Sequence, residues 1–193
     1  MRLLSLASTL LLSASIFAQT APRVAFVPVI NASKKTPKTL QTRQNVAAGE
    51  WLVREMERRS MRLTPIRSIK AELQTQKIDP LQLDKLTTAK WISLGQALKV
   101  DFIVATLILD SKAEKVEKPR FLDTEGVVKM KFWLIDVVRE IPLLNGKEST
   151  FRSGSKHEHL VDLKGDDRQV ESAAKGMKES FSEWLKGFPV KKD

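Results

Sequence analysis

Three apolar segments of the sequence predict the strands of a sheet. Residues Arg23–Ile30 and Val100–Leu109 are rich in valine, isoleucine, leucine and phenylalanine, with too few polar interruptions for strands that expose one face to water. They therefore predict two buried strands near the middle of the sheet, the second of them central. Thr124–Val138 predicts a further, long strand with two distinct faces.

Weaker signals predict the connections between these strands. Met61–Ile69 alternates and contains a proline, which predicts a short edge strand. The highly charged segment 110–123 predicts a solvated loop or hairpin tip. Pro142 and Asn145–Gly146 predict a turn. Glu148–Leu163 then predicts the returning strand.

The segment Leu40–Arg59 has the spacing of an amphipathic helix. Its apolar residues recur at intervals of three and four, and charged residues occupy most of the remaining positions. The stripe that this spacing predicts to be buried contains Val46, Gly49, Val53 and Met56, widened by Trp51 and Leu52.

Three further helices complete the predicted fold. Lys70–Lys77 predicts a short polar helix, and Leu81–Leu98 a second one after a break at a proline. The last helix should begin at Gly165–Asp167, with an aspartate as N-cap and acids in its first turn, where the helix dipole favours negative charge. Its predicted buried stripe contains Val170, Ala173, Ala174, Met177, Phe181, Trp184, Leu185 and Phe188. The order of elements predicts an α/β fold, a single three-layer domain with a mixed β-sheet flanked by helices on both faces.

The first 18 residues have the layout of a cleavable secretion signal. Arg2 supplies the positive start, a short apolar core follows, and Ala18 is a small residue at the expected cut. The apolar core is shorter than the roughly 20 residues that span a bilayer. We expect cleavage after Ala18, or else after Thr20 or Ala21, and an exported domain over residues 19–193 with no transmembrane segment.

Cysteine and charge content refine this expectation. The sequence has no cysteine, so we expect neither disulfides nor a lipid anchor, and the fold must depend on its hydrophobic core. The formal net charge is +10, which favours anionic lipid head groups, wall polymers or acidic proteins as partners, unless it serves solubility alone. The candidate surface for an anionic partner is a cluster of five arginines, namely Arg54, Arg58, Arg59, Arg62 and Arg67.

Candidate catalytic and metal-binding groups are few. His157 and His159 would share one face of a strand, but a metal site needs three or four ligands. Ser153–Ser155 lacks the strand–turn–helix setting of a hydrolase nucleophile. No glycine-rich phosphate loop is present, so no cofactor is expected. The carboxylates Asp101, Asp110 and Asp136 are better explained as acids at turns or strand ends than as catalytic acids.

Three segments resemble one group of exported bacterial domains. They are Arg23-Val-Ala-Phe-Val-Pro-Val-Ile-Asn31, Leu94-Gly-Gln-Ala-Leu-Lys-Val-Asp-Phe-Ile-Val-Ala105 and Phe132-Trp-Leu-Ile-Asp-Val137. The group includes the curli secretion component CsgG, the N-terminal domain of TolB and the penicillin-binding-protein activator LpoB. The resemblance implies a mixed sheet flanked by helices, no enzyme activity, no cofactor, and protein contacts within the cell envelope. The lipid-bearing cysteine of CsgG and LpoB is absent, and the charged segment 111–122 argues against a pore.

The sequence therefore favours a non-enzymatic, exported cell-envelope protein that acts as a protein-binding adaptor or regulator. A binder of anionic lipid or wall polymer through the arginine cluster is the alternative. A secreted hydrolase is the third possibility, which a cleft that combines a histidine, Asp136 and a serine would favour.

Overall fold

The computed structural model of the protein describes residues 21–118, 121–154 and 165–191. The predicted secretion signal, residues 1–18, lies outside them. The described elements, in chain order, are β1 (Arg23–Phe26), β2 (Ile30–Asn31), α1 (Lys38–Arg58), β3 (Arg62–Leu63), α2 (Ile66–Thr75), the 3-10 helix η1 (Pro80–Lys85), α3 (Thr88–Leu98), β4 (Phe102–Lys118), β5 (Phe121–Asp136), β6 (Ile141–Ser153) and α4 (Gly165–Lys186).

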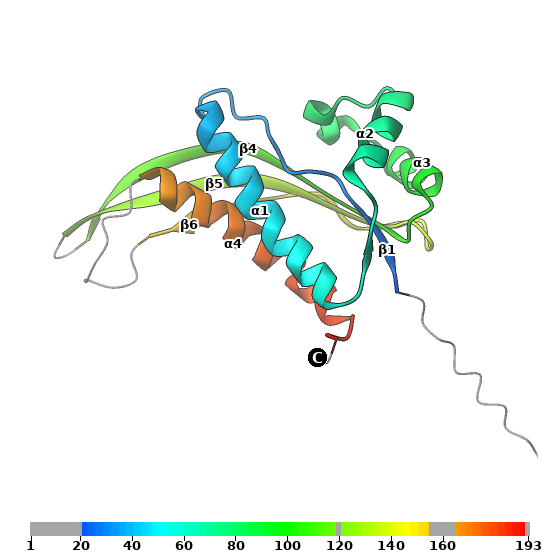
Figure 1. Ribbon diagram of the computed structural model, residues 1–193. Helices are drawn as coiled ribbons and strands as arrows, with labels where there is room; N and C mark the ends of the chain where they lie inside the picture. Colours follow the sequence, from blue (N-terminus) through cyan, green and yellow to red (C-terminus); the bar gives the residue numbers. More distant parts are fainter. Residues whose placement is uncertain (1–20, 119–120, 155–164, 192–193) are drawn as a thin grey trace, which may run out of the picture.

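The strands form one mixed sheet in the order β3-β1-β4-β5-β6, with β2 paired to β4 at Leu107 and Ile108, just beyond the residues that pair with β1 (Figure 1). β1 runs parallel to both of its neighbours, and β2 runs parallel to β4. β4, β5 and β6 are antiparallel to one another. β4 is therefore the central strand, as the apolar run Val100–Leu109 predicts.

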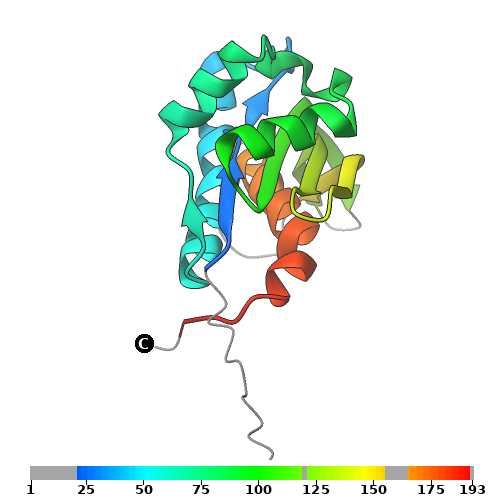
Figure 2. The same ribbon diagram turned by 90° about the vertical axis from the view of Figure 1, so that its right-hand side faces the viewer.

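Helices cover both faces of this sheet, which confirms the predicted three-layer α/β class (Figures 1 and 2). On one face, α1 and α4 pack against a core that includes Leu52, Phe132 and Phe181. On the other face, α2, α3 and η1 pack against a second core that includes Trp91 and Ile103. Figure 1 shows the long β4–β5 hairpin extending away from α2 and α3.

One prediction for the hairpin region is only partly right, because residues 110–118 and 121–123 do form the end of a hairpin but as paired strands, and a second prediction is wrong. The charged segment 110–118 belongs to β4, because its charges find partners across the sheet, such as Arg152 of β6, which lies 2.7 Å from Glu114. The turn before β6 lies at residues 137–140, where Glu140 has a positive φ of 58°. Asn145–Gly146 lies within β6, where Gly146 with φ 65° forms a bulge, and β6 ends at Ser153.

The predicted strand Met61–Ile69 is also mostly wrong. Only Arg62–Leu63 pairs with β1, and α2 begins immediately after Pro65. Proline suits the start of a helix because its φ is already helical and it has no N–H to leave unpaired. The predicted polar helix Lys70–Lys77 is thus the second half of α2. The predicted strand Arg23–Ile30 is divided into β1 and β2 around Pro28, which has no N–H for the ladder.

The prediction for α4 holds for most of its length. Ala173, Met177, Phe181 and Leu185 are buried at the expected spacing. The acids of the first turn are also confirmed, but the helix already includes Gly165, so neither aspartate is its N-cap.

The buried stripe of α1 differs from the predicted one. It follows every fourth residue, through Leu40, Gln44, Ala48, Leu52 and Met56. Of the six predicted residues, only Leu52 and Met56 are buried.

Candidate binding surface

The structure separates the five arginines of the predicted anionic surface into two groups. The three on or next to α1 are neutralised locally, because Arg54 lies 3.0 Å from Glu50 while Arg58 and Arg59 lie 2.9 and 2.5 Å from Glu55. Arg59 also donates to the carbonyl oxygen of Leu185 (2.9 Å), which ties α1 to α4. These side chains have structural partners within the chain.

Glu55 is the acid that these arginines share. Burial of Glu55 raises its pKa. Hydrogen bonds from Arg59 and Arg58 and their positive charges lower the pKa by more than burial raises it, so the pKa falls below its ordinary value of 4.5. The ionised carboxylate therefore stabilises the fold at neutral pH, and this contribution is lost as the pH falls through the lowered pKa.

We predict that Glu55→Gln lowers the free energy of unfolding at pH 7 by up to about 1 kcal/mol, as for a partly exposed ion pair. The difference from the parent chain should shrink below pH 4.5, where both carry a neutral group. Urea unfolding across this range measures it, with Glu50→Gln as the control. A difference that grows in acid would contradict the assignment.

Arg62 and Arg67 form the second group, and both are exposed. Within the described residues neither has an ion pair. Arg62 lies on β3 directly beside Arg23 of β1 in the parallel register. Like charges opposite each other destabilise a sheet. This pair is therefore a local excess of positive charge without a carboxylate partner in the described part of the chain.

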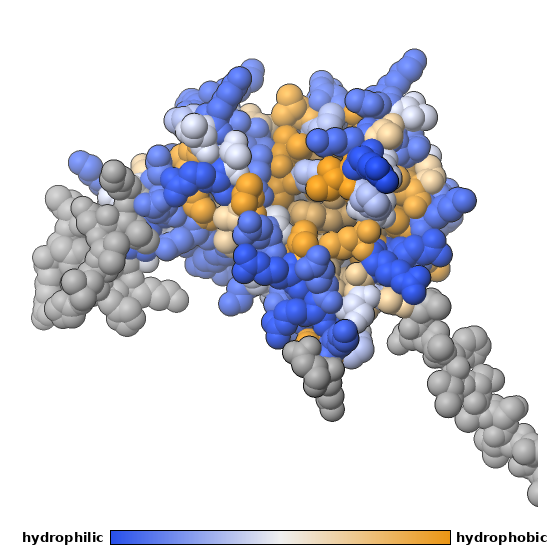
Figure 3. Space-filling view, viewed as in Figure 1, coloured by the Kyte–Doolittle hydropathy of each residue, from blue (hydrophilic) through white to orange (hydrophobic). Residues whose placement is uncertain are grey.

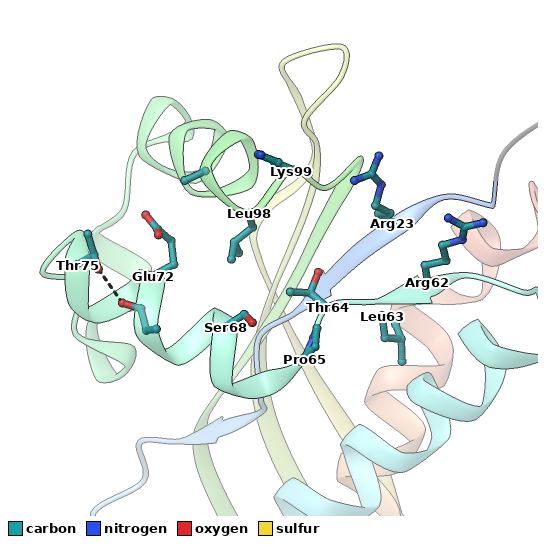
Figure 4. Close-up of a pocket in the computed structure, with 12 residues that line it drawn as sticks. Arg23, Arg62, Leu63, Thr64, Pro65, Ser68, Glu72, Thr75, Leu98 and Lys99 are labelled. Atoms are coloured by element: carbon teal, nitrogen blue, oxygen red, sulfur yellow. Dashed lines mark hydrogen bonds between the residues drawn. The ribbon is translucent and has the colours of Figure 1, made fainter.

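A groove of about 590 Å³ opens beside Arg23 and Arg62. It lies between the strands β1 and β3 and the helices α2 and α3 (Figure 4). We call it the basic groove. Arg23, Arg62 and Lys99 line it as cations, Ser68 adds a hydroxyl, and Glu72 is its one carboxylate. Lys99 ends α3 in the left-handed conformation, which places its side chain at the mouth of the groove.

An apolar area lies next to the basic groove, on the surface between α1 and α2 (Figure 3). Besides Trp51, three residues of the predicted stripe of α1 are not buried. Val46 is 50 % exposed, and Gly49 and Val53 are partly exposed. A Cβ at Gly49 would lie 3.5 Å from the ring of Phe26, a partly exposed residue of β1.

Ile66, the first residue of α2, is also 55 % exposed. It follows Pro65, which lines the basic groove. We define the apolar face by its members on three elements, Phe26, Val46, Gly49, Val53 and Ile66. An exposed apolar surface with a polar rim marks a site of protein interaction.

Two of the three strand-end carboxylates, those of Asp136 and Asp101, make structural hydrogen bonds. The Asp136 carboxylate, only 3 % exposed, accepts a hydrogen bond from the backbone N–H of Arg139 (2.9 Å) and fixes the turn before β6. Asp101 accepts from the backbone N–H of Arg23 (2.7 Å). Both line a cleft of about 800 Å³ beside residues 187–191, which follow α4.

The described residues contain no group of three or more acidic or histidine side chains that could hold a metal ion. His157, His159 and Ser155 lie outside them. None of the helices described between residues 21 and 191 has the length and apolar composition needed to cross a membrane.

Of the five predicted arginines only Arg62 lines the basic groove, and sequence reasoning missed its other cations. Arg23 and Lys99 stand alone in the sequence, and only the parallel pairing of β1 with β3 brings Arg23 beside Arg62. The one sequence feature that could have indicated the groove was a charged residue, Arg23, at the start of an apolar strand.

Comparison with known proteins gives structural neighbours only. No protein-family model and no curated protein sequence matches the chain. It is similar to the lipoprotein GNA1162 from Neisseria meningitidis, at 12 % identity and a TM-score of 0.46 over 84 % of this chain and 99 % of that one. It is also similar to the hypothetical protein CT253 from Chlamydia trachomatis, at 13 % identity and a TM-score of 0.45 over 87 % and 97 % of the two chains.

The C-terminal domain of LpoB from Escherichia coli is a further neighbour, at 11 % identity and a TM-score of 0.33 over 71 % of this chain and 84 % of that one. LpoB is one of the proteins that the sequence segments resemble. With TM-scores below 0.5, these similarities assign neither a family nor a function. The resemblance to CsgG and to TolB stays a prediction.

Proposed function

We propose that this chain is a non-enzymatic protein of the cell envelope that binds another protein through the apolar face, as an adaptor or regulator. The observation that carries this proposal is the exposure of an apolar helix stripe. Val46, Gly49 and Val53 have the spacing of a buried stripe, yet α1 buries a different one. Leaving Val46 and Ile66 half exposed forgoes the stabilisation that burial of apolar surface provides, which a bound partner would restore.

The basic groove next to this face indicates the chemistry of the partner. Arg23, Arg62 and Lys99 attract negative charge, and their attraction speeds encounter and fixes orientation more than it raises affinity. We infer a partner that presents apolar side chains to the apolar face and an acidic segment to the groove. Export to the periplasm or beyond, without a lipid anchor, is part of the proposal and depends on the sequence of residues 1–18.

The test is a crosslinking pulldown from native cell envelopes with the chain carrying a C-terminal tag. The parent protein and two variants are washed at low and high salt. Val53→Asp places a carboxylate in the apolar face, whereas Leu81→Asp is the matched control at a 57 % exposed position on η1. We expect one defined protein that resists high salt with the parent and the control, and whose recovery falls on the order of tenfold or more with Val53→Asp.

The alternative is a binder of anionic lipid or wall polymer at the basic groove, and the like-charged neighbours Arg23 and Arg62 favour it. Its mark would be recovery of lipid or polymer alone, lost at high salt because salt screens exposed charges. That result, unchanged by Val53→Asp and abolished by Arg62→Glu, would overturn the adaptor proposal.

A further inference from the structure

The strand β6 forms one edge of the sheet, at the opposite end from β3. Within the described residues it pairs with β5 alone. Exposed edges invite pairing with another chain unless proline, bulges or charges blunt them. The first half of β6 is blunted in this way, by Pro142 and by bulges at Leu143 and Gly146.

The second half of β6 has neither a proline nor a bulge, and its edge protection is limited to the charged side chains of Lys147, Glu148 and Arg152. Residues 147–153 pair with β5 in an uninterrupted register, from Phe132↔Lys147 to Gly126↔Ser153. The one side-chain contact to its backbone among the described residues is from Lys175, whose Nζ donates to the carbonyl oxygen of Arg152 (3.0 Å). Among the described residues, no other strand pairs with this edge of residues 147–153.

The charges of this half strand complement each other under two-fold symmetry. Glu148, Thr150 and Arg152 are exposed and lie on the same face of the sheet, because side chains alternate along a strand. If a second copy pairs antiparallel with Thr150 opposite Thr150, Glu148 of each copy lies opposite Arg152 of the other. Within one chain Glu148 already contacts Lys129 (2.5 Å) and Arg152 contacts Glu114 (2.7 Å), so pairing across the dimer would extend these ion pairs into one network. Centring the pairing on Glu148 or on Arg152 would set like charges against each other, which is unfavourable.

We infer that two copies of this chain associate through residues 147–153 of β6, as an isologous dimer with one continuous sheet. The helix layer allows this arrangement. Gly176 of α4 packs against Met130 of β5 and Phe151 of β6, so α4 lies over the β5–β6 pair. Two such helices would lie about two strand spacings apart, roughly 9.5 Å, within the range of packed helices.

The dimer does not depend on the proposed function, because the apolar face lies at the other end of the sheet. It would leave both apolar faces free, so each dimer would present two partner sites. A bivalent arrangement strengthens binding to a repetitive or dimeric partner without any new contact.

Single-cysteine crosslinking tests the register directly, because the chain has no cysteine of its own. Paired residues of antiparallel strands have Cα atoms about 4.5 or 5.5 Å apart, and both distances permit a disulfide. Thr150→Cys should therefore form a disulfide dimer on the order of a hundredfold faster than Ser93→Cys, an exposed control on α3, since paired thiols have a millimolar effective concentration. Equal rates of disulfide formation for the two variants would contradict the dimer. A disulfide between Thr150→Cys and a different protein of the sample would contradict it as well.

Charge exchange provides the second test, read by light scattering, with circular dichroism to confirm folding. Glu148→Arg and Arg152→Glu each place like charges together at two positions of the interface and should abolish the dimer. Each also replaces an ion pair within the chain, with Lys129 or with Glu114, so only variants that circular dichroism shows to be folded are compared. The double variant Glu148→Arg/Arg152→Glu restores opposite charges and should recover it. A folded double variant that stays monomeric, or a parent chain that is monomeric at high concentration, would contradict the inference.

Discussion

Replacing Gly126 with alanine should lower the free energy of unfolding by about 3 kcal/mol, the upper end of what overpacking costs. Gly126 of β5 is buried where α4 crosses the sheet, and a Cβ there would lie 2.1 Å from the carbonyl carbon of Arg168 and 2.3 Å from the backbone nitrogen of Gln169. Ser172 holds the two elements at this distance by donating to the Gly126 carbonyl oxygen (2.6 Å). The obstacle is helix backbone, so all of α4 must shift to make room.

Gly49→Ala is the matched control for this substitution. Its Cβ would meet only the ring of Phe26 at 3.5 Å, an ordinary contact, inside the helix α1. We expect it to raise the free energy of unfolding by about 0.5 to 1 kcal/mol, as for glycine to alanine in a helix. Urea denaturation of both variants measures the difference. A Gly126→Ala protein as stable as the parent would show that α4 does not cross β5 as described.

Replacing Gln44 with leucine should lower the free energy of unfolding by about 2 to 3 kcal/mol, because it leaves buried polar groups unpaired. Gln44 is fully buried on α1. It accepts a hydrogen bond from Asn31 Nδ2 (2.7 Å) and donates to Ser111 Oγ (2.6 Å), which in turn donates to Gln169. This chain of side chains joins β2, α1, β4 and α4 in the middle of the core.

The neighbouring substitution Asn45→Leu provides the control. The Asn45 side-chain oxygen is buried but has no hydrogen-bond partner in the described part of the chain, so its removal should change the stability little. Thermal unfolding of the two variants distinguishes the cases. If Gln44→Leu is as stable as Asn45→Leu, the buried chain of hydrogen bonds contributes nothing, and the orientation of α1 has another cause.

The orientation of α1 also explains where sequence reasoning failed. A glutamine suggests a solvated position and valines a buried one, so apolar spacing alone selects Val46 and Val53 for the core. The observed stripe becomes favourable only when Asn31, Ser111 and Gln169, from three other elements, satisfy Gln44. Such non-local partners cannot be derived from the spacing within one helix.

Local pattern was sufficient where burial is continuous. The apolar run of β4 and the regular spacing of α4 both predicted their elements, since hydrophobic burial alone determines them. The charged half of the β4–β5 hairpin could not be predicted, because its lysines and glutamates are stabilised by cross-strand partners. The basic groove was only half predicted for a similar reason, since strand register brings Arg23 to Arg62.

The central claim, that the apolar face binds a partner protein, is tested most directly by photo-crosslinking in living cells from a probe at Val46, with Val190, 44 % exposed beyond α4, as the control position. We predict one protein adduct from Val46 alone, unchanged by Leu81→Asp and lost with Val53→Asp. Adducts of equal yield from both positions, or an adduct at Val46 that persists with Val53→Asp, would contradict the account.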